Sequence, residues 1–366
     1  MRVLVVNAGS SSLKLTLLDA DDQTLASREL AAPGDRVDPA ELRAALDGGL
    51  GDADVVGHRI VHGGERFREA VVVDAGVEAA MRQLADLAPL HQAKSLAALD
   101  AVSAALPDVA AVACFDTAFH ATLPAAASTY ALPASWRERF GLRRYGFHGL
   151  SHAWVARRAP ELLGREAAGL RLVSAHLGAG ASLCAIAGGR SVDTTMGFTP
   201  LEGLVMATRS GSVDPGLLFW LLDHSELSPG EVAGALEHES GLLGLAGSAD
   251  MREVLARAGD GEQQARLALD VYLHRLRAAI AAMAAALGGL DALVFTGGVG
   301  ARSAPVRELT ADGLGFLGVG VDHALNREAT EDGDVSDRDA PVRTLVVLPR
   351  EDLEIARQSR AALRRG

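Results

Sequence analysis

Two segments far apart in this chain share one pattern: an apolar strand, a turn of small residues, and a second apolar strand. The first reads LVVNAGSSSLKLTLL from Leu4, and the second reads LVSAHLGAGASLCAI from Leu172. Short β-prone runs joined by Gly and Ser predict hairpins. Each half later carries helical segments and one buried strand, at Ala110–Phe115 and Ala292–Thr296. A duplicated α/β domain with a cleft between the copies explains this best, and a chance likeness between two hairpins is the alternative.

The first turn carries groups that bind anionic oxygens. Between Asn7 and Lys14 lie an amide, three hydroxyls, an ammonium group and the backbone N–H groups of the turn. This inventory suits a triphosphate. An ordinary polar turn at the start of a domain is the alternative. If the second turn, at Gly178–Gly180, faces the first across the cleft, the two form a clamp for phosphates.

Composition narrows the function further. A length of 366 residues favours two domains, and a net charge of −12 argues against a general nucleic-acid binder, which needs cationic contacts to phosphate. No apolar run is long enough to span a bilayer, and the N-terminus does not read as a signal peptide. Cys114 and Cys184 lie in apolar runs, which predicts buried free thiols and a reducing, cytoplasmic location.

The remaining pattern predicts the secondary elements. Apolar residues at helical spacing run from 77 to 105, interrupted by Pro89, and a long helix is expected at 263–287. We expect a polar connection at 31–54 and a solvated acidic loop at 331–339. Further strands are predicted at 55–61, 172–177, 181–187 and 190–194, and a last helix at 351–365.

Charged and polar side chains stand where predicted strands end. Arg59 lies near the end of one strand, Asp116 follows another, and His148 and Arg209 lie in glycine-containing segments. Ligands of α/β proteins bind at strand ends. Two arginines, a histidine and an aspartate near a phosphate-binding turn indicate phosphoryl transfer, which needs positive groups around the migrating phosphoryl group.

Zinc binding is the competing interpretation of the histidines. His58 and His62 are four residues apart with Glu65 nearby, and His148 and His152 share that spacing. The first pair lies in a β-prone segment followed by two glycines, and the motif lacks the Glu that follows the first His in zinc hydrolases. For the second pair, one functional and one capping or surface histidine is the alternative.

Taken together, the motifs resemble the successive signature blocks of the acetate kinase family. These blocks are NAGSSSLK, VGHRIVHGG, FDTAFH, YGFHGLSH, AHLGAGAS, MGFTPLEGL, TRSGSVDPG, SADMREV, FTGGVGARS and PREDLEIAR, in this order over nearly the whole chain. The resemblance implies a fold similar to actin, Hsp70 and sugar kinases (RNase H-like), with an N-terminal domain of residues 1–117 plus 353–366 on the acyl side. Residues 118–352 would form the nucleotide-side domain. It also implies ATP, a short carboxylate such as acetate, Mg²⁺ (or Mn²⁺) and a homodimer.

The resemblance also implies a role for individual residues. Asn7 and Glu351 would lie near Mg²⁺. Arg59 would bind the substrate carboxylate, and Asp116 would be the active-site acid. Catalysis would also use His148 and Arg209. The first phosphate loop would contain Ser10, Ser12 and Lys14. The nucleotide site would comprise His176, Leu177, Gly178, Ala179, Gly180, Asp250, Met251, Arg252, Gly298, Val299, Gly300, Ala301 and Arg302. The acyl pocket would comprise Val61, Leu90, Phe147 and Pro200. Since a carboxylate is ionised at pH 7, it needs no strong base, and Asp116 is more plausibly an organiser of Mg²⁺, Arg or water.

Three departures from the family pattern bear on specificity. Ala179 replaces an Asn of the second phosphate loop, Ala301-Arg302 replaces an acid-amide pair, and Gln92 to Ser95 replaces a segment that usually reads NPPN. The change to Ala301-Arg302 puts adenine or ribose recognition in doubt and leaves a different phosphoryl donor open, and the change at Gln92 to Ser95 bears on the acyl pocket or the dimer-side loop. A preference for propionate or butyrate is also open, and a non-catalytic protein that binds nucleotide or acyl phosphate is the alternative from another class. An Hsp70-like chaperone is disfavoured, since no peptide-binding extension follows residue 366.

Overall fold

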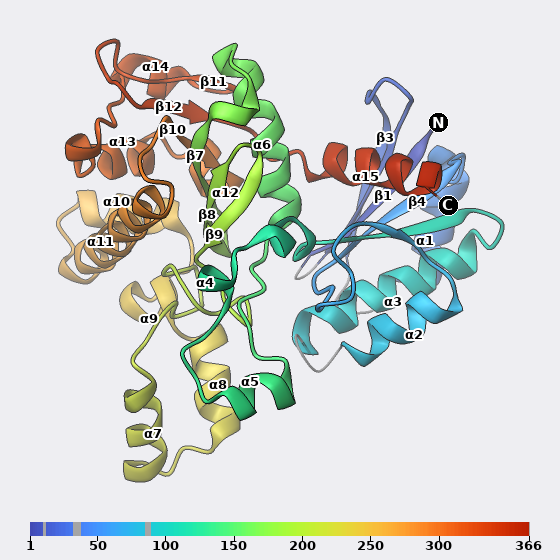
Figure 1. The fold of residues 1–366 in the computed structure, drawn as a ribbon, viewed down its shortest axis with the longest axis horizontal. Coiled ribbons are helices and arrows are strands. Elements are labelled where there is room, and N and C mark those ends of the chain that lie inside the picture. The colour runs from blue at the N-terminus through green and yellow to red at the C-terminus, as the bar shows by residue number, and fades with distance from the viewer. Residues whose placement is uncertain (10–11, 32–37, 85–88, 366) are drawn as a thin grey trace. The chain divides into compact units, whose positions relative to one another are not determined.

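The computed structural model describes residues 1–9, 12–31, 38–84 and 89–365, and gives only the backbone of residues 89–91. The chain divides into two compact units (Figure 1). Unit 1 comprises Met1–Ala121, Phe147–Trp154 and Arg350–Gly366, and unit 2 comprises Thr122–Gly146 and Val155–Pro349. Relative to the predicted domains, unit 1 also takes in 118–121, 147–154 and 350–352.

Unit 1 is built on a mixed six-stranded sheet in the order β3-β2-β1-β4-β6-β5. The predicted first hairpin is confirmed, because β1 and β2 pair antiparallel with Val3 opposite Leu18 and Ala8 opposite Leu13. The central strands β1, β4 and β6 are parallel. The strands are β1 (Val3–Ala8), β2 (Ser12–Leu18), β3 (Thr24–Ala31), β4 (Val55–Ile60), β5 (Val71–Val72) and β6 (Ala110–Phe115).

Both faces of the central strands of this sheet are covered, whereas the edge strand β3 is mostly exposed. Leu4 and Val6 of β1 pack toward Leu42 of α1 and Val102 of α3, whereas the alternate residues of β1 pack toward the C-terminal helix α15. Gly57 of β4 permits the close approach of α15, since a Cβ there would lie 2.4 Å from the hydroxyl of Ser359. The helices are α1 (Pro39–Ala45), the π-helical turn η2 (Leu46–Leu50), α2 (Ala75–Gln83), α3 (Pro89–Ala105), the 3-10 turn η4 (Ala118–Thr122) and α15 (Glu351–Arg365).

Unit 2 repeats the same sheet topology in the order β11-β12-β10-β7-β8-β9. The hairpin of β7 and β8 corresponds to that of β1 and β2, and parallel β10 and β12 correspond to β4 and β6. The predicted duplication is therefore confirmed. The strands are β7 (Arg171–Leu177), β8 (Ala181–Ala187), β9 (Arg190–Thr194), β10 (Ala292–Thr296), β11 (Gly333–Asp334) and β12 (Arg343–Val346).

Helices surround the second sheet, and the long helix α11 (Gln263–Ala286) packs against β8, as predicted for an amphipathic segment. The helix α6 (Gly149–Leu163) begins in unit 1 and continues into unit 2. The other helices are α4 (Ala125–Ser128), α5 (Ala134–Phe140), η5 (Ala167–Gly169), α7 (Pro215–His224), α8 (Pro229–His238), α9 (Gly241–Ala246), α10 (Met251–Gly259), α12 (Gly297–Arg302), α13 (Ala304–Asp312), η6 (Gly315–Leu317) and α14 (His323–Glu328).

The predictions of a connection at 31–54 and a solvated loop at 331–339 are wrong, because both segments contain regular secondary structure. Within 31–54, the described residues form α1 and η2, and Leu42, Leu46 and Leu50 bury their side chains in the core of unit 1. Within 331–339, β11 pairs with β12, and Val335 is buried. Acidic residues of that segment make ion pairs with Arg158 and Arg343 rather than facing only water.

The prediction for the two cysteines is confirmed. Cys114 and Cys184 are buried free thiols, each on a strand, and burial raises the pKa of both to about 12. Among the described helices, none combines the length and the apolar character needed to cross a bilayer.

Candidate functional site

The parallel strands of unit 1 bring four predicted site residues into one hydrogen-bonded chain. Arg59 lies on β4, Asp116 follows β6, Asn7 lies near the end of β1, and Glu351 starts α15. Arg59 Nε and Nη2 both donate to Asp116 Oδ2, at 3.0 and 2.7 Å, and Arg59 Nη1 donates to Asn7 Oδ1 at 3.1 Å. Asn7 Nδ2 donates to Glu351 Oε2 at 3.2 Å. Because β1, β4 and β6 are parallel neighbours, their side chains meet at the carboxyl ends of these strands.

The ion pair of Arg59 and Asp116 is largely withdrawn from water, with side chains 18% and 2% exposed. Burial acts to lower the pKa of Arg59, but the carboxylates of Asp116 and Glu351 raise it above its ordinary value, so the guanidinium stays charged. Burial raises the pKa of Asp116, and the positive charge of Arg59 opposes that shift. Arg59 therefore favours the ionised form of Asp116, whereas burial and the charge of Glu351 oppose it and leave the pKa of Asp116 above its ordinary value.

The side-chain oxygens in this hydrogen-bonded series of residues suit a hard divalent cation. Asp116 Oδ1 is buried without a hydrogen-bond partner among the described residues, and Glu351 and Asn7 add further oxygens beside it. Mg²⁺ prefers oxygen ligands and typically takes one or two carboxylates, with phosphates and waters completing the shell. The donor set of these three residues is thus compatible with the predicted metal.

His148 is held next to Asp116 by its backbone. His148 has φ of +56°, a left-handed conformation that is uncommon outside glycine. The following Gly149 donates its N–H to the carbonyl of Asp116 at 2.9 Å, and a Cβ on Gly149 would lie 2.1 Å from that oxygen. Only glycine permits this approach, and it fixes the His148 turn against the residue that pairs with Arg59.

The first turn is described only in part, since Ser10 lies outside the described residues. Gly9 N–H donates to the carbonyl of Ser12 at 2.8 Å, which closes the turn. Lys14 is exposed and stands opposite Asn7 in the ladder, so both side chains leave the same face. Ser12 Oγ donates to Glu29 at 2.6 Å, a partner that the sequence did not suggest.

The predicted acyl-pocket residues are divided between the two units. Val61 and Phe147 are buried in unit 1, and the side chain of Leu90 lies outside the described residues. Pro200 belongs to unit 2, where its carbonyl accepts a hydrogen bond from Arg209 Nη1 at 3.2 Å. Burial lowers the pKa of Arg209, although a guanidinium so perturbed remains protonated.

Gln92, which stands in the segment that departs from the family pattern, has a definite structural role. Its Nε2 donates to the carbonyl of His62 at 3.1 Å, and its Oε1 accepts from the N–H of His62 at 3.0 Å. The side chain is fully buried. This two-point contact fixes the backbone next to Val61.

A cavity of about 750 Å³ in unit 2 gathers most of the predicted nucleotide-site residues. Gly178, Ala179, the segment Asp250–Arg252, Gly298, Val299 and Arg302 all line it. Arg252 Nη2 donates to Asp250 Oδ2 at 2.5 Å, and this contact lowers the pKa of Asp250 to about 2. The volume lies in the range of small-molecule sites.

The remaining predicted nucleotide residues do not line this cavity. Leu177 and Ala301 are buried, and Ala301 packs in an apolar cluster with Val335 and Val346. The substitution of an acid by Ala301 therefore changes the protein interior, whereas Arg302 lies on the cavity wall. His176, Gly180 and Gly300 are also absent from its described lining.

Several lining residues were missed by sequence reasoning. They are Ala207, Leu242, Ala249, Leu255, Tyr272, Ser303 and Pro305. Leu255 and Tyr272 lie on α10 and α11, where helical spacing indicates only that an apolar residue is buried. Ser303 ends the block FTGGVGARS, Pro305 follows it, and Ala249 lies within SADMREV, so membership of these blocks, or proximity to them, was the usable signal.

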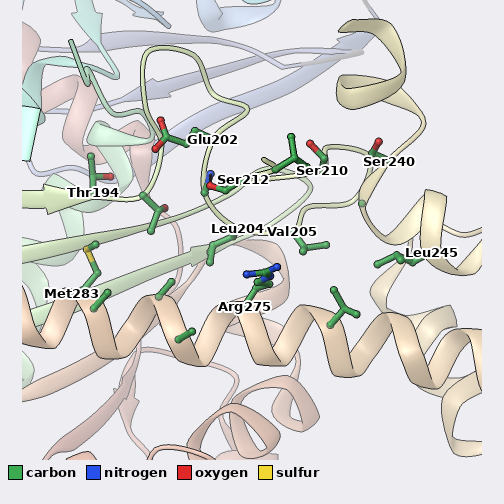
Figure 2. Close-up of a pocket in the computed structure, with 18 of the residues that line it drawn as sticks. Thr194, Glu202, Leu204, Val205, Ser210, Ser212, Ser240, Leu245, Arg275 and Met283 are labelled. Carbon is green, nitrogen blue, oxygen red and sulfur yellow. Dashed lines mark hydrogen bonds between the residues drawn. The ribbon is translucent and has the colours of Figure 1, made fainter. Parts of the chain in front are cut away.

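Figure 2 shows a second cavity of unit 2, of about 840 Å³, between α11 and the segment around Glu202 to Ser212. Arg275 projects from α11 among Leu204, Val205 and the serine hydroxyls. In its described lining, none of the predicted site residues occurs. Ser210 and Ser212, however, closely follow Arg209 in the chain.

Comparison with known proteins gives a consistent result. Residues 39–357 match the Acetokinase family. The chain is similar to a protein described as acetate kinase from Nostoc punctiforme, at 50% identity covering 84% of this chain and 76% of that protein. It is similar to the crystal structure of Porphyromonas gingivalis acetate kinase, at 35% identity and a TM-score of 0.90, covering 99% of each chain. It is also similar to a propionate kinase from Francisella tularensis subsp. tularensis, at 32% identity and a TM-score of 0.91, covering 98% and 99%. These likenesses confirm the predicted fold class.

Proposed function

This chain belongs to the acetokinase family, and we propose that it transfers a phosphoryl group reversibly between ATP and acetate, giving acetyl phosphate and ADP. The single observation that carries this proposal within the structure is the hydrogen-bonded chain of Glu351, Asn7, Arg59 and Asp116 at one sheet edge. In the proposed direct in-line transfer, a carboxylate oxygen of acetate bonds to the γ-phosphorus. The bond from phosphorus to the β,γ-bridging oxygen breaks, and ADP leaves with that electron pair.

Arg59 is the proposed binding group for acetate. A guanidinium has five N–H groups in a planar fork and can hold a carboxylate at two points, which Lys cannot do. The contacts with Asp116 and Asn7 use three of these N–H groups and fix the plane of the fork. Acetate is already ionised at pH 7, so the reaction needs no general base. Asp116 accordingly acts as the orienting partner of Arg59.

We assign Asn7, Asp116 and Glu351 as the side chains that would hold Mg²⁺ or Mn²⁺. Bound there, the ion would neutralise phosphate charge as phosphoryl transfer proceeds. Asp116 Oδ1, which is buried without a partner among the described residues, supports this assignment.

His148 and Arg209 are the proposed donors to the equatorial oxygens of the migrating phosphoryl group. His148 belongs to unit 1 and Arg209 to unit 2, so this role requires the two units to approach each other around the substrates. Closure would also exclude water, which would otherwise take the phosphoryl group from ATP. Small-angle scattering should show compaction when nucleotide binds, and an unchanged radius of gyration would argue against closure.

The 750 Å³ cavity of unit 2 is the proposed nucleotide site. Its lining joins the β7–β8 turn at Gly178 to the start of α12 at Gly298, two glycine positions that let backbone N–H groups approach phosphates. In unit 1, Ser12 and Lys14 are proposed to meet the same phosphates from the first turn.

The acyl pocket is proposed to consist of Val61, Leu90, Phe147 and Pro200, and Val61 favours a short chain because a smaller residue there would make room for another methylene group. The likeness to a propionate kinase structure makes propionate the specific competitor to acetate. One methylene group is worth about 1–3 kcal/mol in such a pocket. The values of kcat/KM for acetate, propionate and butyrate will rank them.

We also propose a cytoplasmic homodimer. Helix α7 supports self-association, because none of its side chains is buried and Leu217, Phe219 and Trp220 are 46, 68 and 56% exposed. An apolar helix face of this kind marks an interaction surface. A molar mass near twice 38.0 kDa in light scattering is expected, and a monomer that retains full activity would contradict the dimer.

The experiment that tests the activity is hydroxylamine trapping of acetyl phosphate. Acetate, Mg²⁺ and each of ATP, GTP and pyrophosphate are incubated with the protein, and acetyl hydroxamate is measured. ATP should give product. If product formed only with GTP or only with pyrophosphate, that compound would be the phosphoryl donor. If none gives product while calorimetry detects nucleotide binding, the protein is a non-catalytic binder and the kinase proposal fails.

A further inference from the structure

His120 is a buried histidine that the proposed mechanism does not use. It lies on η4, four residues after Asp116, and is 1% exposed. Burial lowers its pKa to about 4, so the ring is neutral at pH 7. Its Nε2 lies 3.0 Å from the carbonyl oxygen of Phe147. A carbonyl can only accept a hydrogen bond, so Nε2 carries the proton in this tautomer.

This contact falls on the residue that precedes His148. On the other side of His148, Gly149 N–H donates to the carbonyl of Asp116, and the carbonyl of His148 itself accepts from the N–H of His152 at 2.9 Å. The peptide groups on both sides of His148 are therefore tied to the protein. One of these hydrogen bonds, to the carbonyl of Phe147, is made by the side chain of His120 and can therefore be changed by substitution.

The surroundings leave the His120 ring little freedom. The ring of His152 meets it edge to face, with centroids 5.7 Å apart. The ring of His62 meets Phe147 in the same manner at 5.5 Å. His62, His120 and His152 are all buried, and their rings contact the Phe147 ring or one another. The left-handed backbone of His148, with φ of +56°, is thus flanked by hydrogen bonds on both of its peptide groups.

We propose that His120 is a positioning residue for His148: its Nε2–H holds the Phe147 carbonyl and thereby aims the His148 imidazole at the phosphoryl group. The proposal rests on the proposed function. A misplacement of about 1 Å in a catalytic group can cost about 10²-fold in rate, and so His120 should affect kcat without contacting a substrate.

Two substitutions separate the hydrogen bond from the packing. His120→Leu removes the donor, and His120→Gln supplies an amide N–H in place of Nε2–H. We expect kcat to fall about 10- to 100-fold in His120→Leu with KM for ATP unchanged, and His120→Gln to recover most of the loss. His58→Gln is the matched control, since His58 is equally buried but points to the sheet face opposite Arg59 and makes no described contact with the His148 turn. It should leave kcat within twofold.

A double substitution decides whether the effect passes through His148. In a His148→Ala background, His120→Leu should cause no further loss of kcat. Multiplication of the two losses, or a kcat for His120→Leu within twofold of the unmodified protein after correction for folded fraction, would overturn the proposal.

An NMR measurement keeps this test independent of the proposed activity. The ring C–H resonances of His148, assigned by their loss in His148→Ala, should shift in His120→Leu and return in His120→Gln. Resonances that stay in place would overturn the positioning role even in an active enzyme. Shifts that follow this pattern in a protein without acetate-phosphorylating activity would show that the proposed function had failed and the positioning had not.

Discussion

Units 1 and 2 share one strand order but differ in what stands at the ends of their parallel strands. In unit 1, those ends carry the ion pair of Arg59 and Asp116, joined to Asn7 and Glu351. In unit 2, the equivalent edge opens into a cavity lined by Gly178, Gly298 and apolar helix side chains. The duplicated framework therefore places two different kinds of site by the same geometry. On the proposed function, unit 1 supplies most of the groups around acetate and the metal ion, and unit 2 supplies the nucleotide cavity together with Arg209.

The sharpest way to break this division is to change Arg59. Arg59→Lys should lower kcat/KM for acetate by about 10³-fold, because an ammonium cannot hold Asp116 and acetate in one plane. Kinetics with acetate varied at saturating ATP will measure it. Arg82→Lys is the control, since Arg82 makes exposed ion pairs with Glu78 and Asp100. A loss below tenfold in Arg59→Lys would show that acetate does not depend on this fork.

The units should also differ in their response to acid. Burial lowers the pKa of His58 to about 3 and of His62 and His120 to about 4, and all three lie in unit 1. Below a pH of about 6.5 the unfolded chain binds protons that the folded unit does not. Stability is then lost as pH falls from about 6.5 toward 4, by about 1.4 kcal/mol per pH unit for each histidine.

Hydrogen exchange followed by mass spectrometry at pH 8 and pH 5, corrected for intrinsic rates, will check this expectation. From pH 8 to pH 5, the protection of peptides from unit 1 should fall by more than that of peptides from unit 2. His58→Gln should reduce the difference, whereas replacement of the exposed His274 should not. Equal loss of protection in both units would show that the buried histidines of unit 1 are not the source of the acid sensitivity.

A bulky substitution in the cavity of unit 2 should affect the nucleotide alone. Leu255→Trp adds volume to the wall, and we expect KM for ATP to rise about tenfold while KM for acetate stays the same. Leu267→Trp is the control on α11, where Leu267 is 57% exposed. If Leu255→Trp raised both KM values equally, the two sites would not be separable.

The smallest expected effect concerns purine choice. Arg302 lines the cavity, and a guanidinium only donates hydrogen bonds, so it suits O6 and N7 of guanine better than the 6-amino group of adenine. Arg302→Asn should lower the ratio of GTP to ATP use by about two- to fivefold. Arg266→Asn, at an exposed position of α11, serves as the control. An unchanged ratio would place Arg302 away from the base.

The parts of the fold that were predictable are those with a strong local pattern. The strands β6, β8 and β10 were predicted with their observed bounds, because each is a short apolar run bounded by polar or glycine residues. The duplication followed from the two hairpins. By contrast, α1 and η2 escaped notice because their buried residues Leu42, Leu46 and Leu50 are spread among charged residues and glycines, in a segment read as a connection.

For the site, the sequence predicted which strand ends carry functional side chains but not how those side chains pair. Arg59 was expected to face the substrate, and its contact with Asp116 depends on the neighbouring placement of β4 and β6. Tyr272 and Leu255 reach the cavity from helices distant in the chain, and no local signal marks such contributions. The pairing of Gln92 with His62 was likewise invisible in a segment known only for departing from a pattern.

Helix α15 covers one face of the first sheet and contributes Glu351, yet it follows the whole of unit 2 in the chain. During synthesis, strands β1 to β6 leave the ribosome long before their apolar covering exists. Unit 2, whose elements lie in a nearly continuous stretch, has no such delay. The amino-terminal portion must therefore wait, uncovered on that face, until α15 has been synthesised, and that interval is when a chaperone or a premature stop would matter most.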